Sequence, residues 1–389
     1  MSLGLLTFHR QLNYGGVLQA LALHDTLHAL SGKPVETINL WMDPRDSALL
    51  GKVDNPNLPL YARVRNAFKA RRFPIGREAY EVRRAKTRHL LGTRLNLSAA
   101  NYRSSRDLRR LPPYETVVVG SDQVWNYDLL RAFNGRNPWL CLDLPATQDR
   151  VAYAASFGVS ELPAAFHAEY RRALSAFRAI TVRERSGCEL LGSLLGPETP
   201  GAQAPVLDPT LLWTEADWRR EIAARPTPER YLLCYWLADV SPERLAWLKR
   251  VSEQMALPIV LLVSKPLRTL PDVGTWLTLR FDADPLDFVA LIAHAEGIVT
   301  DSFHGLQFSA LFRRRIVCYV EPATGGTSAS ARFHDFCRRY GVGEVCRDIA
   351  CFYQDALPPL VDLADRLDGE RLEADRQASL SRLAELLKR

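Results

Sequence analysis

Short apolar segments alternate with longer segments of helical periodicity along most of the chain, and this alternation limits the possible folds more than any other feature. The first repeat consists of an apolar strand at Leu3–Phe8, a helical pattern at Val17–Leu30 and a second strand at Val35–Leu40. In the helical segment, Val17, Leu21, Leu27 and Leu30 lie near one face. A strand–helix–strand series predicts parallel strands joined by helices that pack on both faces of the sheet. The sequence therefore predicts the α/β class.

The alternation occupies two blocks, which predicts two domains. Between the two blocks lies the polar stretch Arg225–Arg230, which contains two prolines and is typical of a linker. We therefore expect an N-terminal Rossmann-like domain over 1–225, a C-terminal Rossmann-like domain over 231–365 and an amphipathic helix over 366–389. Further strands are expected at 116–120, 150–155, 179–182, 231–236, 259–263, 276–281, 297–300 and 316–320.

A basic segment interrupts the first block. We expect residues 42–110 to form a helical insertion, and 62–110 hold 15 lysines and arginines against three acidic residues. Such an asymmetry suggests an acidic partner, above all an anionic membrane surface, and a solvated helical insertion is the alternative. The chain contains no helix-turn-helix, zinc-finger or RNP pattern, so we expect no nucleic-acid partner.

The amino-acid composition narrows the classes of protein to which the chain can belong. The 389 residues are 47% hydrophobic and 24% charged, as in ordinary soluble proteins. No apolar run reaches the roughly 18 residues of a membrane span, and the first residues lack the pattern of a signal peptide, so we expect a cytoplasmic protein. Seven scattered cysteines without CxxC spacing predict reduced core thiols and no metal site, although Cys346 and Cys351 could pair on oxidation.

Ligands of open parallel sheets bind beyond the carboxyl ends of the strands, so the residues that follow each strand are the candidate site residues. After the first strand comes a segment that ends in Asn13, Tyr14, Gly15 and Gly16 and opens a helix. Glycines and free N–H groups at a helix start suit an anion, and a tight turn is the alternative. The segment is neither GxGxxG nor a Walker loop, which gives no support to nucleotide binding by those motifs.

Three further strand ends carry polar residues. Ser121 and Asp122 follow one strand, and either can cap a helix. Asp122 can also be a base. The nearby Trp125 forms either an apolar wall or part of the core. Arg183 follows the next, where its guanidinium suits a carboxylate or phosphate unless it pairs internally with Glu184. Asp208 precedes a proline, and we interpret it as a structural turn.

The stretch Thr300-Asp-Ser-Phe-His-Gly305 contains the candidate acid. Asp301 ends a strand, Ser302 is a good helix cap, and His304 lies in the first turn of the helix. A bound phosphate or carboxylate would favour the protonated imidazole, so His304 can act as a general acid near neutral pH. A structural histidine is the alternative.

Five of these segments together resemble one known family. Asn13–Ala20, Gly120–Asn126, Arg183-Glu184, Val206–Leu212 and Thr300–Gly305 occur in the order seen in the polysaccharide pyruvyl transferase family. The resemblance runs from about residue 3 to about residue 345, and each segment lies at a predicted strand end. It implies a GT-B-like fold, in which two Rossmann-like domains face a cleft.

The resemblance also implies an activity, the transfer of a pyruvyl group from phosphoenolpyruvate to a sugar of a polysaccharide or lipid-linked glycan precursor, as a ketal. The N-terminal domain would take the acceptor and the C-terminal domain the donor, without cofactor or metal. His304 then matches the family's acid and Arg183 its donor clamp, with Asp122 or Asp301 as the base. Many members have Ser-Arg-x-His where this chain has Phe303, so Arg332 is the candidate replacement cation.

Two other functions stay open. A GT-B glycosyltransferase that uses a nucleotide sugar would need the same fold, with Arg183 and the start of the 302–305 helix on the diphosphate. A non-catalytic member of the family is the second alternative, and Phe303 in the His motif is the feature that favours it. For an enzyme of glycan synthesis, the basic segment 62–110 suggests peripheral attachment to the inner face of an anionic membrane.

Overall fold

The computed structural model describes residues 1–10, 12–41, 71–127, 137–237, 240–320, 330–352, 354 and 357–388, so 42–70 of the expected basic insertion lie outside the described residues. Contacts divide the chain into two compact units, Met1–Pro59 with His89–Leu212 and Glu373–Arg389, and Leu60–Arg88 with Trp213–Leu372. The domain ranges expected from the sequence stay predictions, because grouping by contacts does not test whether either range folds alone.

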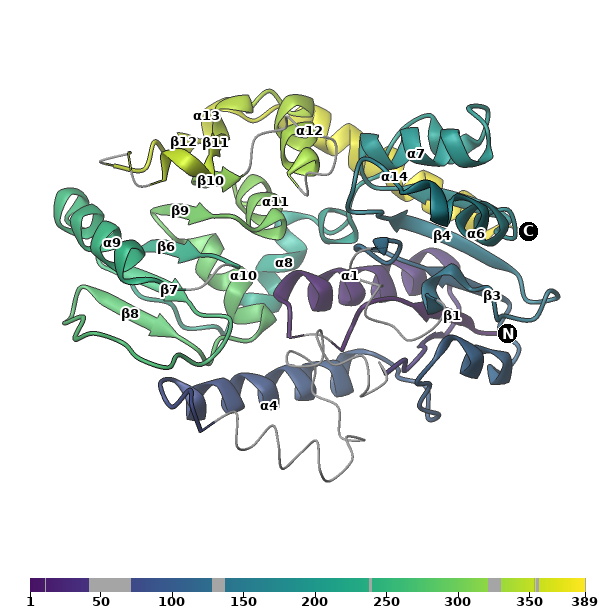
Figure 1. Ribbon diagram of the computed structural model, residues 1–389, viewed down its shortest axis with the longest axis horizontal. Helices are drawn as coiled ribbons and strands as arrows, with labels where there is room; N and C mark the ends of the chain where they lie inside the picture. The colour runs from purple at the N-terminus through teal and green to yellow at the C-terminus, as the bar shows by residue number, and fades with distance from the viewer. Residues whose placement is uncertain are drawn as a thin grey trace. The chain divides into compact units, whose positions relative to one another are not determined.

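The first unit contains a sheet of five parallel strands, in the order β2-β1-β3-β4-β5 (Figure 1). Its strands are β1 (Leu3–Leu6), β2 (Val35–Thr37), β3 (Thr116–Val119), β4 (Arg150–Ala155) and β5 (Ala179–Val182). Its helices are α1 (Tyr14–Ser31), α6 (Ala164–Leu174), α7 (Arg185–Leu195) and the short η1 (Ser105–Arg110), η2 (Pro138–Leu140), η3 (Pro200–Ala202) and η4 (Pro209–Leu211). The strands expected at 150–155 and 179–182 are confirmed at both ends.

The second unit contains a parallel sheet in the order β11-β10-β9-β6-β7-β8, with β12 antiparallel to β10. Its strands are β6 (Leu232–Tyr235), β7 (Ile259–Leu262), β8 (Leu277–Arg280), β9 (Gly297–Thr300), β10 (Arg315–Val320), β11 (Cys346–Asp348) and β12 (Val361–Asp362). Its helices are α8 (Glu215–Ile222), α9 (Pro242–Met255), α10 (Pro285–His294), α11 (Phe303–Leu311), α12 (Ala331–Arg339), α13 (Leu363–Arg366), η5 (Gly343–Val345) and η6 (Ile349–Cys351).

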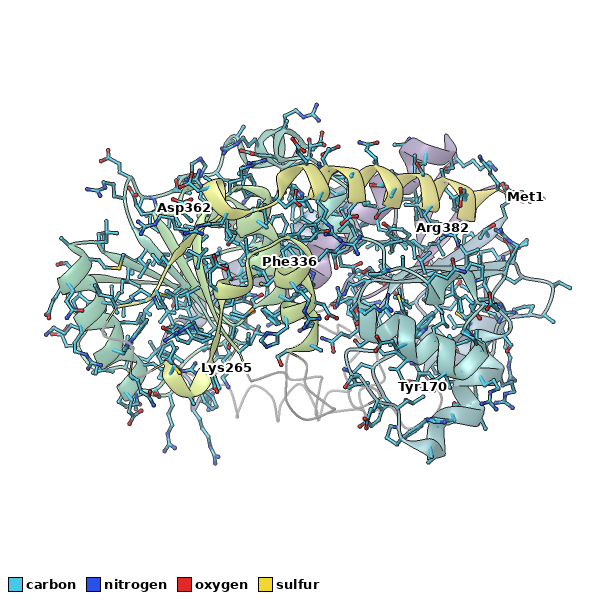
Figure 2. The ribbon with its side chains drawn as sticks, turned by 90° about the horizontal axis from the view of Figure 1, so that it is seen from above. Met1, Tyr170, Lys265, Phe336, Asp362 and Arg382 are labelled. Carbon is cyan, nitrogen blue, oxygen red and sulfur yellow. The ribbon has the colours of Figure 1, made fainter. Side chains whose placement is uncertain are left out.

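Two long helices, α4 (Arg77–Arg94) and α14 (Gly369–Leu387), contribute residues to both units. Figure 2 shows α14 in yellow, with Arg382 labelled. Several cations of α4 have partners inside a unit. The Arg83 side chain is buried with Nη1 3.5 Å from the Val263 carbonyl, and Lys86 forms an ion pair with Asp287. At Arg83 and Lys86, the basic segment on α4 thus has a structural role within a unit.

The local sequence explains where the key helices begin. Asn13 caps α1, because its side-chain oxygen accepts hydrogen bonds from Gly15 N and Gly16 N. In α10, Asp284 and Asp287 form a capping box around Pro285. The strands of the first sheet and the central strands β6, β7 and β9 of the second are almost fully buried, as expected for parallel sheets covered on both faces, whereas β8, β11 and β12 are partly exposed.

Each sheet has one point where the strand order reverses. In the first unit β2 lies on one side of β1 and β3 on the other, so the reversal falls between β1 and β3. In the second unit it falls between β6 and β9. Ligands of doubly wound sheets bind outside the carboxyl ends of the strands at such switch points. The structure thus confirms the predicted α/β class and the two Rossmann-like parallel sheets of a GT-B-like chain. The strand order also marks one candidate site in each unit.

Candidate functional site

The first switch point is built around a buried glutamine. Gln19 on α1 donates through Nε2 to Thr7 Oγ1 at 2.9 Å, and its Oε1 accepts a hydrogen bond from Ser121 N at 3.1 Å. Ser121 is fully buried and donates from Oγ to the Ala154 carbonyl. These bonds fix the ends of β1, β3 and β4 relative to one another. They make Ser121 part of the frame that holds the neighbouring Asp122.

Asp122 lies beside the N-terminus of α1. Its Oδ2 is 3.6 Å from the position that a Cβ atom on Gly16 would occupy, and its Oδ1 accepts a hydrogen bond from Arg183 at 3.2 Å. The backbone φ of Asp122 is 66°, a left-handed conformation that aspartate adopts more readily than most residues. Helix N-termini attract negative charge, so the Asp122 side chain lies between two electropositive neighbours, the start of α1 and Arg183.

Arg183 faces three carboxylates. Nη1 contacts Asp208 at 2.5 Å, Nη2 contacts Asp122, and Nε lies 3.5 Å from Glu184. The side chain is only 1% exposed. Burial of the guanidinium opposes its charge, but the attraction of Asp208, Asp122 and Glu184 outweighs burial and raises the pKa of Arg183 above its ordinary value. The geometry favours the internal ion pair that the sequence left open, with two further partners.

Asp208 and Glu184 are themselves held in place. Asp208 Oδ1 accepts hydrogen bonds from the backbone N and the Oγ1 of Thr210, at 3.0 and 2.8 Å. Glu184 accepts a hydrogen bond from Ser156 Oγ at 2.5 Å. One arginine and three carboxylates give this group a formal charge of −2. A rigid, electronegative corner of this kind suits hydroxyl groups or a cation better than a polyanion.

Two aromatic candidates near this corner are buried. Trp125 is fully buried, donates from Nε1 to the Trp139 carbonyl and packs 5.4 Å from Phe157, between ring centroids. This is the core position that the sequence left as an alternative to an apolar wall. Tyr14, in the first turn of α1, is 1% exposed. At the helix start, Gly15 N and Gly16 N are bound by the Asn13 side-chain oxygen, and Asn13 itself is half-buried.

A neutral histidine lies at the same edge of the sheet. His9 follows β1 and is 1% exposed, and its Nδ1 lies 3.1 Å from the Thr7 carbonyl. Burial, together with the nearby Arg10 charge, lowers the pKa of His9 to about 4. His9 is therefore uncharged at neutral pH and adds no positive charge to the first switch point.

The second switch point is built around the start of α11. Ser302 caps the helix by accepting a hydrogen bond from Gly305 N at 3.3 Å, and its own N–H donates to Thr300 Oγ1 at 3.0 Å. Asp301 Oδ1 accepts a hydrogen bond from Leu237 N at 2.8 Å, which links the ends of β9 and β6. A Cβ atom on Gly305 would lie 3.0 Å from Thr300 Oγ1, so a larger residue would require Thr300 to shift by a few tenths of an ångström.

His304 lies in the first turn of α11, between the cap and an aromatic cluster. His304 is 8% exposed, and the centroid of its ring is 6.3 Å from that of Phe303. Phe303 packs on Phe333 and Phe336 of α12, at 5.4 and 6.1 Å between centroids. The aromatic cluster thus joins the His motif to α12.

A cation is present beside Phe303. The Arg332 guanidinium carbon lies 5.2 Å from the Phe303 ring centroid and 5.8 Å from that of Phe333, within the range of cation–π contacts. Arg332 is half-buried at the start of α12. The second switch point therefore combines a helix N-terminus, an arginine and a histidine, groups that suit a small anion that must be protonated.

Sequence reasoning missed Gln19 and one contact of Asp208. Asp208 is the structural turn that was expected, since it caps η4 by accepting a hydrogen bond from Thr210 N, but its ion pair with Arg183 was not predicted. Gln19 and Asp208 are each a polar residue inside an apolar run, Val17-Leu-Gln-Ala-Leu21 and Val206-Leu-Asp-Pro-Thr-Leu-Leu212. A polar side chain in such a run must find a buried partner, and this signal could have pointed to a network. Among the described residues, no cluster of His, Cys, Asp and Glu is arranged to hold a metal ion.

Comparison with solved structures gives distant similarities over nearly the whole chain. Escherichia coli ADP-heptose lps heptosyltransferase II is 13% identical, with 98% of this chain and 99% of that chain covered and a TM-score of 0.38. Arabidopsis thaliana UGT89C1 is 13% identical, with 99% and 98% covered and a TM-score of 0.45. The UDP-GlcNAc 2-epimerase of Methanocaldococcus jannaschii is 11% identical, with 98% and 93% covered and a TM-score of 0.45.

No curated protein matches the sequence. The sequence profile of one family, polysaccharide pyruvyl transferase, matches residues 13–320. That range begins at the Asn13 cap of α1 and contains Gln19, Asp122, Arg183, Asp208 and the Thr300–Gly305 motif, whereas Arg332 lies beyond it. The chain belongs to the polysaccharide pyruvyl transferase family.

Proposed function

We propose that the protein transfers a pyruvyl group from phosphoenolpyruvate to two hydroxyl groups of a sugar, in a polysaccharide or a lipid-linked glycan precursor. The observation that carries the proposal is the second switch point, where the start of α11 holds His304 and the Arg332 guanidinium lies 5.2 Å from the ring of Phe303. Family membership supports a transferase that acts on polysaccharide. The choice of phosphoenolpyruvate as the donor goes beyond family membership and is part of the proposal.

Phosphoenolpyruvate needs cations and N–H groups for its carboxylate and its phosphate. The N-terminus of α11, beside the Ser302 cap, carries a partial positive charge that suits one anionic group. Arg332 suits the other, because a guanidinium binds a carboxylate or a phosphate in bidentate fashion. Arg332 then replaces the basic residue that many family members carry at the position of Phe303. Phe303 keeps a role, since its ring supports the guanidinium.

His304 is the proposed general acid. Protonation of the methylene carbon of the donor makes a methyl group and leaves an oxocarbenium-like centre at C2. A sugar hydroxyl attacks C2 and loses its proton, inorganic phosphate leaves, and a second hydroxyl attacks and loses its proton to close the ketal. General acid–base assistance of this kind is typically worth about 10²–10⁴-fold in rate.

Asp122 is the proposed base for the sugar hydroxyls. Asp301 was the other candidate, but its Oδ1 accepts the Leu237 N–H, whereas Asp122 Oδ2 lies beside Gly16 at the start of α1. Arg183 contacts Asp122 directly, so we assign it to orient this carboxylate. The Asn13, Gly15 and Gly16 segment is the proposed contact surface for the sugar.

The proposal includes peripheral attachment to an anionic membrane. Within the part of 62–110 that the structure describes, Arg103, Arg106 and Arg110 are exposed around η1. No helix of the described residues is both long and apolar enough to cross a membrane. Flotation with vesicles of rising anionic lipid content tests the attachment. Binding that does not depend on anionic lipid or salt would contradict it.

The activity test supplies phosphoenolpyruvate with a panel of glycosides that carry neighbouring free hydroxyl pairs. The expected result is phosphate release that requires the glycoside, together with a new ketal methyl signal in the proton NMR spectrum. A parallel series supplies UDP-sugars as donors. Release of UDP without any release of phosphate from phosphoenolpyruvate would replace the proposal with glycosyl transfer, and inactivity with both donors across the panel would favour a non-catalytic member.

A further inference from the structure

Three of the seven cysteines meet in the second unit. Cys337, near the end of α12, and Cys346, the first residue of β11, have their Sγ atoms 3.4 Å apart. Cys318 on β10 is the register partner of Cys346. The sequence had left Cys346 and Cys351 as the pair that could oxidise, because they are neighbours along the chain. In the structure, the partner of Cys346 is Cys337.

We propose that Cys337 and Cys346 are a modification site, a dithiol that a small-molecule disulfide such as oxidised glutathione converts to an intrachain disulfide. A disulfide needs an S–S distance of about 2.05 Å, so the two sulfur atoms must approach by only about 1.4 Å. The backbone between them is already folded back. Val342 N donates to the Cys337 carbonyl at 2.8 Å, and Val345 N donates to the Val342 carbonyl at 3.1 Å.

The surroundings of the two thiols set the order of the reaction. Cys346 is half-buried and open to a reagent, whereas Cys337 is 1% exposed. A hydrogen bond to Cys346, and then burial, raise the pKa of Cys337, so Cys337 is a poor first attacking group and the more exposed Cys346 reacts first. Cys318 is fully buried, which raises its pKa well above the ordinary value, and it is a poor attacking group.

The chemistry is two successive thiol–disulfide exchanges. The Cys346 thiolate attacks one sulfur of oxidised glutathione, forms a mixed disulfide and releases one glutathione thiolate. Cys337 then loses its proton, attacks Cys346 Sγ and releases the second glutathione. The protein gives up two electrons and two protons in total, and the reagent is reduced to two thiols.

The site lies next to the aromatic cluster of the second switch point. Phe336, labelled in Figure 2, directly precedes Cys337 on α12 and packs on Phe303. Arg332 lies one turn earlier on the same helix. Oxidation would therefore join α12 covalently to the edge strand β11 and fix the helix that carries Arg332. This inference is independent of the proposed function, because it needs neither a donor nor an acceptor.

The test oxidises the purified full-length protein with glutathione disulfide and maps its peptides by mass spectrometry without reduction. The expected product is a Cys337–Cys346 linked peptide in a protein that has lost two hydrogen atoms. Faster hydrogen exchange in α12 of the reduced protein than in that of the oxidised protein is the second expected result. A linkage to Cys351 or Cys318, or no intrachain linkage, would overturn the proposal.

Three serine variants sharpen the result. Cys337→Ser should stop at a stable glutathione adduct on Cys346, because the second exchange has no thiol. Cys351→Ser and Cys318→Ser are the matched controls and should still form the Cys337–Cys346 linkage. If Cys351→Ser abolished the linkage, or if Cys346 of Cys337→Ser still formed an intrachain disulfide with another cysteine, the assignment of the pair would be wrong.

Discussion

The two switch points obey the same topological rule and hold opposite chemistry. At the first, the Arg183 cation is shared among Asp122, Glu184 and Asp208, and the formal charge is −2. At the second, Arg332 lies against the ring of Phe303 beside the capped start of α11 and His304. A parallel sheet fixes where a ligand binds, but the side chains at the strand ends decide which ligand can bind.

This difference assigns the two substrates in the proposed reaction. A group of net negative charge repels a phosphate but can accept protons from hydroxyl groups, so the first corner suits the sugar. A helix N-terminus with an arginine attracts an anion, so the second corner suits phosphoenolpyruvate. The predictions below test the comparison by changing one corner at a time.

The largest effect is expected at the second corner. His304→Ala should lower kcat with phosphoenolpyruvate by about 10²–10⁴-fold, because the donor loses its general acid. The melting temperature should change little. His294→Ala, which alters an exposed histidine at the end of α10 in the same unit, is the control and should keep its turnover. Unaltered turnover in His304→Ala would remove this residue from the mechanism.

The next effect is expected at the first corner. Asp122→Asn keeps the shape of the side chain but removes the base, so kcat should fall by about 10²-fold while the affinity for phosphoenolpyruvate stays the same. Steady-state kinetics with both substrates separate the two quantities. Asp143→Asn changes another buried carboxylate of the first unit, one that pairs with Arg109. A loss of kcat in Asp143→Asn equal to that in Asp122→Asn would point to a general structural effect.

A stability effect should follow from the buried carboxylates. Asp208→Asn removes the negative charge 2.5 Å from Arg183 Nη1 and should lower the free energy of unfolding by about 2 kcal/mol. Asp149→Asn breaks the more exposed pair with Arg178 and should cost less than about 1 kcal/mol. Urea unfolding measures both. Equal losses in the two variants would show that Asp208 does not hold the network.

The smallest effects compare the two motif glycines. Gly305→Ala places a Cβ atom 3.0 Å from Thr300 Oγ1 and should destabilise the fold by about 1 kcal/mol or more. Gly16→Ala places a Cβ atom 3.6 Å from Asp122 Oδ2, which is an ordinary contact distance. Alanine also has a higher helix propensity than glycine, so the free energy of unfolding of this variant should stay within about 0.5 kcal/mol of the wild-type value. Thermal unfolding of both variants tests this order. The reverse order would contradict the two packing distances.

Much of the fold could be predicted from periodicity. Strands such as Arg150–Ala155 and Gly297–Thr300 stand out because they are apolar, β-branched or small, and bounded by polar residues. The short edge strands β11 and β12 were missed, since two or three residues carry no period. Helix α8 was missed because its sequence, EADWRREI, has few apolar residues and is set by the Thr214 capping box.

The site could be predicted only in part. Local signals identified the strand ends and the Ser302 cap, because caps and turns depend on neighbouring residues. Of the partners of Arg183, only Glu184 could be named from the sequence. Asp122 and Asp208 are 61 and 25 residues away along the chain, and only the sheet order brings them together. For the same reason, the core position of Trp125 could not be distinguished from a position on a ligand surface.

Calorimetric titration with phosphoenolpyruvate, and separately with UDP, tests the division between the two corners most directly. The account predicts that phosphoenolpyruvate binds the wild-type protein, that Arg332→Ala weakens this binding about tenfold or more, and that Asp122→Asn leaves it intact. It also predicts no comparable binding of UDP. The account would be contradicted if UDP alone bound, or if phosphoenolpyruvate binding were lost in Asp122→Asn and unchanged in Arg332→Ala.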